Sequence, residues 1–149
     1  MERLYPQGAS WLQRRLDEVE TRRAQAIVAV CGNRLAGVAI ETPKETGRLK
    51  LSTLWTHPAH RRQGVGRSLL VHGRRAWLER GVDRTDVTCA ASAAASLAPL
   101  LHASGFSLQH LERDRYGEGR HELVFSWFPD ADPWSAGPRI PGGTSTTSY

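Results

Sequence analysis

The stretch Leu51–Leu70 reads LSTLWTHPAHRRQGVGRSLL and decides the expected fold. An alternating, strand-like run ends at Thr56, a proline and a basic turn with Gly64 and Gly66 follow, and an amphipathic helix then begins. Glycine lets the backbone approach an anion without an intervening Cβ, and the first turn of a helix presents free N–H groups and the positive end of its dipole. The stretch therefore predicts a phosphate-binding loop between a strand and a helix.

Two common glycine motifs do not fit this loop. A Rossmann loop needs a third glycine where Leu69 stands, and a Walker loop needs glycine at Arg61 and lysine at Arg67. Seven arginines lie between Arg61 and Arg84, which favours an anionic ligand. An ordinary strand-to-helix connection with solvated arginines is the alternative that the loop alone leaves open.

The hexapeptide RRQGVG at 61–66 resembles the (Gln/Arg)-x-x-Gly-x-(Gly/Ala) pyrophosphate loop of the GNAT superfamily, the acyl-CoA-dependent N-acyltransferases. The strand before it, Pro58, and a later Ser104-Gly105-Phe106, similar to the family's Gly-Phe before its sixth strand, occur in family order. The resemblance spans about residues 26–128. It implies an α+β (mixed α/β) fold with a mostly antiparallel central sheet, a splayed parallel pair of strands and flanking helices.

The resemblance also implies acetyl-CoA as co-substrate. Its expected contacts are Trp55, Thr56, Arg61, Arg62, Gln63, Gly64, Val65, Gly66, Arg67 and Ser68. Backbone donors should dominate, whereas Ser68 is as well explained by local capping, and Arg62 and Arg67 by solvation. The net charge of +5 and a pI near 9.9 also suit a nucleic-acid-binding module. Aromatic residues do not interleave with the basic ones, so nucleic acid is the less favoured partner.

Length and composition indicate one domain. With 149 residues and 40% hydrophobic content, we expect a single domain at 1–128 and a Pro/Gly/Ser/Thr-rich tail at 129–149. An apolar run of about 18 residues and a signal-peptide pattern are both missing, so we expect no membrane contact and a cytoplasmic location. Cys31 and Cys89 lie in apolar runs and are expected to be core thiols.

Hydrophobic periodicity supplies the remaining elements. On the key strand at 49–56, Leu49, Leu51, Thr53 and Trp55 are expected to share one face. The other expected elements are helices at 10–23, 66–80 and 93–103, and strands at 26–31, 35–41, 86–89, 106–112 and 121–128. The family opens with a strand and two helices, so an abbreviated N-terminal arm is implied here. The groove for the acceptor would then be open, or completed by the tail or by a second subunit in a homodimer.

The chemistry implied by the family is direct attack of an amine on the acetyl thioester in a ternary complex. A main-chain N–H of Trp55 or Thr56 would polarise the thioester carbonyl. The tyrosine that often serves the leaving thiolate is replaced by Leu101, so His102 is the remaining candidate acid, with a surface or capping role as its alternative. Tyr116, on a turn flanked by glycines, is a further candidate on the acceptor side, with a turn aromatic as its alternative. Glu41 is the candidate base, with an exposed strand-end charge as its alternative.

These departures keep a second class of function open. Deprotonation through ordered water would need no dedicated base. A non-catalytic acyl-CoA-binding sensor or protein-interaction module of the same fold would need none of these groups. A metal site is not expected, because His57 and His60 have no third ligand nearby in sequence.

Overall fold

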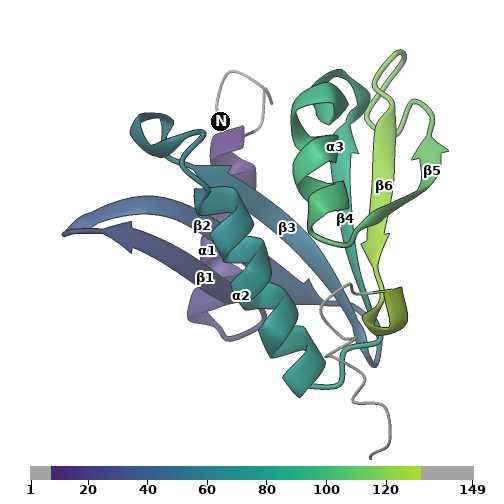
Figure 1. Ribbon diagram of the computed structural model, residues 1–149. Helices are drawn as coiled ribbons and strands as arrows, with labels where there is room; N and C mark the ends of the chain where they lie inside the picture. The colour runs from purple at the N-terminus through teal and green to yellow at the C-terminus, as the bar shows by residue number, and fades with distance from the viewer. Residues whose placement is uncertain (1–7, 132–149) are drawn as a thin grey trace, which may run out of the picture.

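The computed structural model describes residues 8–131, and these form a six-stranded sheet with three α-helices (Figure 1). The order of the strands is β1-β2-β3-β4-β6-β5, and every neighbouring pair is antiparallel except β3 and β4. The elements are α1 (Gly8–Glu20), β1 (Gln25–Cys31), β2 (Arg34–Pro43), β3 (Arg48–Thr56), η1 (Pro58–His60), α2 (Val65–Glu79), β4 (Arg84–Ala90), η2 (Ala91–Ala93), α3 (Ala94–Ala103), β5 (Ser107–Glu112), β6 (Glu122–Trp127) and η3 (Pro129–Ala131). The tail predicted at 129–149 lies outside the described residues from 132 onward.

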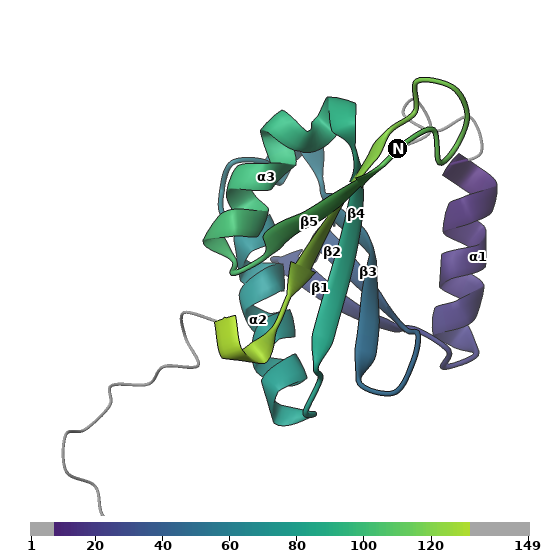
Figure 2. The ribbon, with the colours of Figure 1, turned by 90° about the vertical axis from the view of Figure 1, so that its right-hand side faces the viewer.

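The helices divide between the two faces of the sheet. Figure 2 shows α2 and α3 on one face and α1 on the other. We call these the α2 face and the α1 face. The main core lies between the sheet and α2 and α3, where Trp77, Trp127 and Leu101 are fully buried. Burial of these large apolar side chains supplies most of the driving force for packing this layer.

The hydrophobic spacing at 66–80 predicts a buried stripe of Leu69, Leu70, Gly73, Ala76 and Trp77, and α2 buries all of these except Ala76. It also buries Arg74 instead of the expected Ala76, because the Arg74 guanidinium donates a hydrogen bond of 2.8 Å to the carbonyl oxygen of Ser104. This contact ties α2 to the end of α3. The Ser104-Gly105-Phe106 motif ends α3, with Gly105 at a φ of 85° and the Phe106 N–H donating to the Leu101 carbonyl.

A β-bulge interrupts the pairing of β2 and β3. Ile40 pairs with Thr53 and Glu41 with Leu51, so Ser52 has no partner on β2. Because a one-residue shift turns the following side chains to the other face, Leu51 faces the core whereas Thr53 faces α1. Leu54 returns to the core side. The prediction that Leu49, Leu51, Thr53 and Trp55 share one face is therefore wrong beyond Leu51.

The parallel pair splays apart at the same level. Pairing of β3 with β4 runs from Arg48↔Arg84 to Leu51↔Val87 and stops there, whereas β4 stays paired with β6 as far as Ala90. A bulge bends its strand and increases the local twist, which accounts for the divergence of the two strands in Figure 1. The splayed parallel pair expected from the sequence is thus confirmed.

Smaller differences concern the edge of the sheet and the ends of elements. Cys89 is buried, which raises the pKa of its thiol, but Cys31 is exposed, because it ends the edge strand beside the turn at Gly32. The expectation of two core thiols is wrong for Cys31. Helix α1 ends at Glu20, three residues before its predicted end. Among the described helices, none is both long and apolar enough to cross a membrane.

Candidate active site

The loop before α2 has the backbone conformation of an anion cradle. Gly64 is the N-cap residue with a φ of 80°, and Arg62 is also left-handed with a φ of 61°. No side chain caps the helix, and its first internal hydrogen bond is donated by the Ser68 N–H to the Gly64 carbonyl. The N–H groups of the first turn therefore have no acceptor within the helix and can bind an anion.

The glycines around this loop have two different roles. A Cβ built on Gly64 meets nothing within 4 Å, so its open side is available to a ligand. A Cβ on Gly37 would lie 2.7 Å from Val65 Cγ1 and 2.9 Å from the Trp55 carbonyl oxygen. Gly37 therefore lets the start of α2 approach β2. The sequence analysis missed this residue, although a glycine inside a strand pattern signals close backbone approach.

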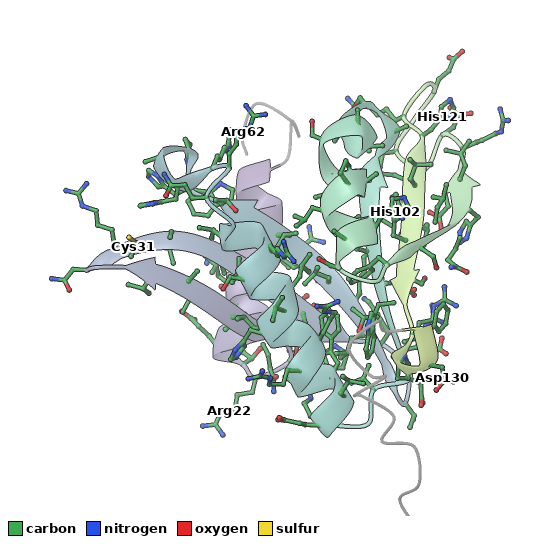
Figure 3. The ribbon with its side chains drawn as sticks, viewed as in Figure 1. Arg22, Cys31, Arg62, His102, His121 and Asp130 are labelled. Atoms are coloured by element: carbon green, nitrogen blue, oxygen red, sulfur yellow. The ribbon has the colours of Figure 1, made fainter. Side chains whose placement is uncertain are left out.

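The side chains predicted to contact the cofactor are mostly solvent-exposed. Arg61, Arg62, Gln63, Arg67 and Ser68 are all exposed, and Figure 3 shows Arg62 beyond the start of α2. Ser68 lines a shallow hollow on the β1 side of α2, together with Ile27, Val28, Ala29, Leu69 and His72. The cradle therefore consists mainly of backbone groups.

The strand register distinguishes the two candidate polarising groups. The His57 N–H donates to the Ala36 carbonyl on β2 at 2.8 Å. Since successive N–H groups of a strand point to opposite edges, the Trp55 N–H also faces β2, whereas the Thr56 N–H faces the gap between β3 and β4. The Thr56 side chain lies beside the loop, because its Oγ1 is 3.9 Å from a Cβ built on Gly66. Of the two residues, Thr56 can polarise a group in the gap.

Glu41 lies inside the protein, and its alternative description as an exposed strand-end charge is wrong. The side chain accepts hydrogen bonds from Trp77 Nε1 at 2.6 Å and from the Arg80 guanidinium at 2.5 Å. Both partners lie at the C-terminal end of α2, Trp77 in its last turn and Arg80 as its C-cap residue, far from the loop at its start. This placement engages the Glu41 carboxylate in joining α2 to β2.

The candidate residues His102 and Tyr116 lie on opposite faces of the sheet. The exposed His102 packs its ring against the buried Phe125 of β6, with 5.6 Å between the ring centroids. Leu100 lies against the loop, with its Cδ2 3.1 Å from a Cβ built on Gly66, and residues two apart in a helix differ by about 200° in direction. His102 therefore points away from the loop (Figure 3). Tyr116 is 56% exposed, in the connection between β5 and β6 that leans toward the α1 side in Figure 2.

The position of the family tyrosine is also clearer in the structure. Leu101 is fully buried in the core, and its neighbour Leu100 is the residue of α3 that faces the loop. Both residues are leucines, so neither can donate a proton to a leaving group. The part of α3 that faces the loop therefore offers an apolar surface and no proton donor.

Two charged residues on the α1 face were missed as candidates. Glu122, which pairs with Ala90 at the end of β4, is only 5% exposed, and burial raises the pKa of its carboxyl. Lys50, which pairs with Asp86, is half-buried, and burial lowers the pKa of its ammonium group, with further lowering by Arg115. The sequence carries no local signal for this pair, because three strands must assemble before the two residues share a face.

An ion-pair network holds the closed end of the gap. Asp86 on β4 accepts hydrogen bonds from Arg48 at 2.8 Å, Arg84 at 2.6 Å and Ser126 at 2.5 Å. Burial alone would raise the pKa of Asp86, but these hydrogen bonds outweigh it and the pKa is lowered. The network joins β3, β4 and β6 below the point where β3 and β4 separate.

Comparison with known proteins identifies the family. The model of the acetyltransferase (GNAT) domain matches residues 22–107, so the chain belongs to the GNAT family. No curated protein matches the chain by sequence. In the described part of the chain, no group of three or more His, Cys, Asp or Glu residues could hold a metal ion.

Solved structures share the fold. An acetyltransferase of the GNAT family from Desulfovibrio desulfuricans is 19% identical, with a TM-score of 0.75 over 83% of this chain and 82% of that chain. The ribosomal-protein-S18-alanine N-acetyltransferase of Escherichia coli is 25% identical, with a TM-score of 0.63 over 71% and 69%. A GNAT acetyltransferase from Elizabethkingia anophelis, with acetyl-CoA bound, is 14% identical, with a TM-score of 0.67 over 76% and 80%.

Proposed function

We propose that this protein is an N-acetyltransferase that transfers the acetyl group of acetyl-CoA to a primary amine by direct attack in a ternary complex. The observation that carries the proposal is the Thr56 N–H, which the register directs into the gap between β3 and β4, beside the start of α2. A phosphate cradle and a polarising donor thus lie next to each other. Both are parts that an acyl transfer from CoA requires.

The residues present fit CoA. The open side of Gly64 and the first-turn N–H groups of α2 would hold the pyrophosphate, with Arg61, Arg62, Gln63 and Arg67 around them. Val65 and Gly66 complete the turn, and the side chain of Ser68 faces the hollow beside β1. Acetyl-CoA supplies the acetyl group as a thioester, which an amine can attack without a covalent enzyme intermediate.

The chain itself performs the remaining tasks with few side chains. The Thr56 N–H stabilises the negative charge that develops on the thioester oxygen. Leu100 and Leu101 occupy the part of α3 where a proton donor would serve the leaving thiolate, so solvent supplies that proton. Positioning and carbonyl polarisation then provide most of the rate acceleration.

A screen for turnover tests this function. Purified protein is incubated with acetyl-CoA and a panel of primary amines, and CoA release is measured with a thiol reagent. We expect release with at least one class of amine. Tight CoA binding without release for any amine would overturn the enzyme proposal in favour of the non-catalytic acyl-CoA sensor.

Two further expectations accompany the proposed function. The relatives include a protein-alanine N-acetyltransferase and an aminoglycoside 6'-N-acetyltransferase, which supports an amine acceptor for this chain. A cytoplasmic location and a homodimer stay predictions. Light scattering after size-exclusion chromatography tests the oligomeric state, and a polynucleotide-binding assay at moderate salt tests the less favoured nucleic-acid partner.

A further inference from the structure

Two opposite charges on the α1 face have no hydrogen bond or ion pair among the residues that the structure describes. They are the carboxylate of Glu122, a residue that is 5% exposed, and the ammonium group of Lys50, which is half-buried. Buried charges are normally paired, because removing them from water without a partner is unfavourable. Two such groups on one face therefore point to a ligand that supplies the missing partners.

Their positions flank the gap between β3 and β4. Lys50 lies on β3 just before the last paired residues, Leu51 and Val87. Glu122 lies opposite Ala90, where β4 has already separated from β3. Arg115 and, less strongly, Lys50 lower the pKa of Glu122, whereas Glu112, opposite it on β5, raises that pKa. These charges therefore interact with Glu122, yet neither cation has a nitrogen atom within the 4.0 Å of an ion pair with its carboxylate.

Two of the neighbouring cations, Arg115 and Arg15, are already partnered. Arg115, in the β5–β6 connection, forms an ion pair with Glu112 of β5, and Arg15 of α1 pairs with Glu18 at 2.8 Å. The cations Arg115, Lys44 and Arg15 all disfavour the charged form of Lys50. An incoming anion would relieve this repulsion, and an incoming cation would find its partner in Glu122.

We propose that Glu122 binds the ammonium group of the acceptor and takes up its proton, while Lys50 binds an anionic group on the same molecule. The acceptor class is therefore an amino acid or another small zwitterionic amine. This inference rests on the proposed N-acetyltransferase function and names its acceptor site.

The geometry places this site on the correct side for attack. The phosphate cradle opens α2, which packs on the α2 face, so the cofactor arm reaches the gap from that face. The Thr56 N–H lies in the gap itself. An amine attacks the trigonal thioester carbon from one face of the carbonyl plane, and the α1 face with Lys50 and Glu122 is the side of the gap opposite α2 and its cradle.

The proton and bond changes balance. The acceptor ammonium gives one proton to the Glu122 carboxylate and becomes a neutral amine. Its nitrogen forms the new C–N bond as the C–S bond breaks, and the remaining surplus proton of nitrogen passes through solvent to the thiolate. Glu122 returns its proton to solvent, so one amide, one CoA thiol and one proton leave the enzyme.

Matched acceptors test the pairing with Lys50. Glycine, β-alanine, γ-aminobutyrate and the α-amino acids are each compared with their amides, which keep the amine and lose the anionic group. Binding to the CoA-saturated protein is followed by calorimetry, and turnover by CoA release. We expect at least one zwitterion to exceed its amide by about tenfold or more in kcat/KM. Lys50→Met should raise KM for the zwitterion and remove the preference over the amide. Lys50→Arg keeps the positive charge and should keep that preference.

The control for Lys50 is Arg120→Met, which removes an exposed cation of the β5–β6 connection and should leave the preference unchanged. Equal or better binding of every amide in the parent protein would overturn the assignment of Lys50. So would a preference that survives Lys50→Met. If no zwitterion binds at all, the inference fails even where other amines are acetylated. If zwitterions bind but no amine yields CoA, the proposed acetyl transfer fails separately.

The pH profile tests Glu122. Activity should increase with pH as the Glu122 carboxyl loses its proton. Because burial raises the pKa of Glu122, the midpoint of this increase should lie above the ordinary glutamate pKa of about 4.3. Glu122→Gln keeps the shape and should erase this limb while lowering kcat by about 100-fold or more. Glu118→Gln, which changes an exposed carboxyl in the β5–β6 connection, is the control. A folded Glu122→Gln protein with the parental kcat and pH limb would overturn the role of Glu122.

Discussion

The two faces of the sheet bring functional groups to the gap in different ways. On the α2 face, the cradle comes from one continuous segment, Arg61–Ser68, and consists of backbone groups and glycines. On the α1 face, Lys50 and Glu122 come from separate strands and act through their side chains. A shared phosphate group needs only a backbone shape, whereas recognition of a particular acceptor needs side chains in a particular arrangement.

The difference implies that substitutions on the two faces should impair different steps of the reaction. Changes in the cradle should remove cofactor binding and therefore all turnover. Changes on the α1 face should alter the choice of acceptor and the pH profile while CoA still binds. Substitutions of residues such as Glu41, which joins α2 to β2, should lower the stability of the fold more than they change CoA binding or the choice of acceptor.

The largest effect is expected for Gly64→Val. The residue has a φ of 80°, where a β-branched side chain is strained by about 1–3 kcal/mol, and the new methyl groups would fill the open side of the cradle. We expect CoA affinity to fall by about 100-fold or more, with turnover nearly eliminated. A thermal-shift titration with CoA measures this, because a ligand of the native state raises its stability. Gly81→Val, a left-handed glycine at the other end of α2, should keep the CoA response.

A smaller loss of affinity is expected for Gly37→Ala. The new Cβ would lie 2.7 Å from Val65 Cγ1 and 2.9 Å from the Trp55 carbonyl oxygen, so α2 must move away from β2. We expect a loss of stability of about 1–3 kcal/mol from overpacking, with CoA affinity reduced by about tenfold through the displaced first turn. Urea unfolding and a CoA titration measure the two quantities. Parental CoA affinity in this variant would show that the cradle does not depend on the approach of α2 to β2.

Glu41→Gln should distinguish a framework residue from a catalytic one. Loss of the charge weakens the contact with Arg80 while the amide can still accept from Trp77, so we expect a loss of stability of about 1–3 kcal/mol. The kcat should change by less than about tenfold, since a general base contributes about 100-fold or more. Unfolding curves and steady-state kinetics separate the two effects. A folded variant with a thousandfold lower kcat would instead identify Glu41 as the base.

The smallest effects are expected for His102→Ala and Tyr116→Phe. His102 packs on Phe125 away from the loop, and Tyr116 is 56% exposed with its ring 5.6 Å from the Arg115 guanidinium carbon. Each substitution should change kcat by less than about tenfold, because solvent protonates the thiolate. Kinetics across pH check this prediction. Loss of a pH limb in either variant would identify the missing acid.

The sequence by itself determined the strand–loop–helix segment around Gly64, the order of the elements and the break between α3 and β5 at Ser104-Gly105-Phe106. These features depend on local backbone conformation, in which Gly64 and Gly105 adopt left-handed φ angles that favour glycine. Periodicity likewise located α2 and most of its buried stripe, because a helix repeats over neighbouring residues. Local interactions of this kind are readable without knowledge of the fold.

Only the tertiary structure decided which side chains meet at the gap. The bulge at Ser52 turned Thr53 and the following residues to the opposite faces, and a single unpaired residue leaves no distinct mark in a pattern of alternation. The choice of Thr56 over Trp55 depended on hydrogen bonds to β2, and the role of Glu41 on its contacts with α2. Lys50 and Glu122 share a face because β3, β4 and β6 assemble, so their relation arises from long-range strand pairing and not from sequence spacing.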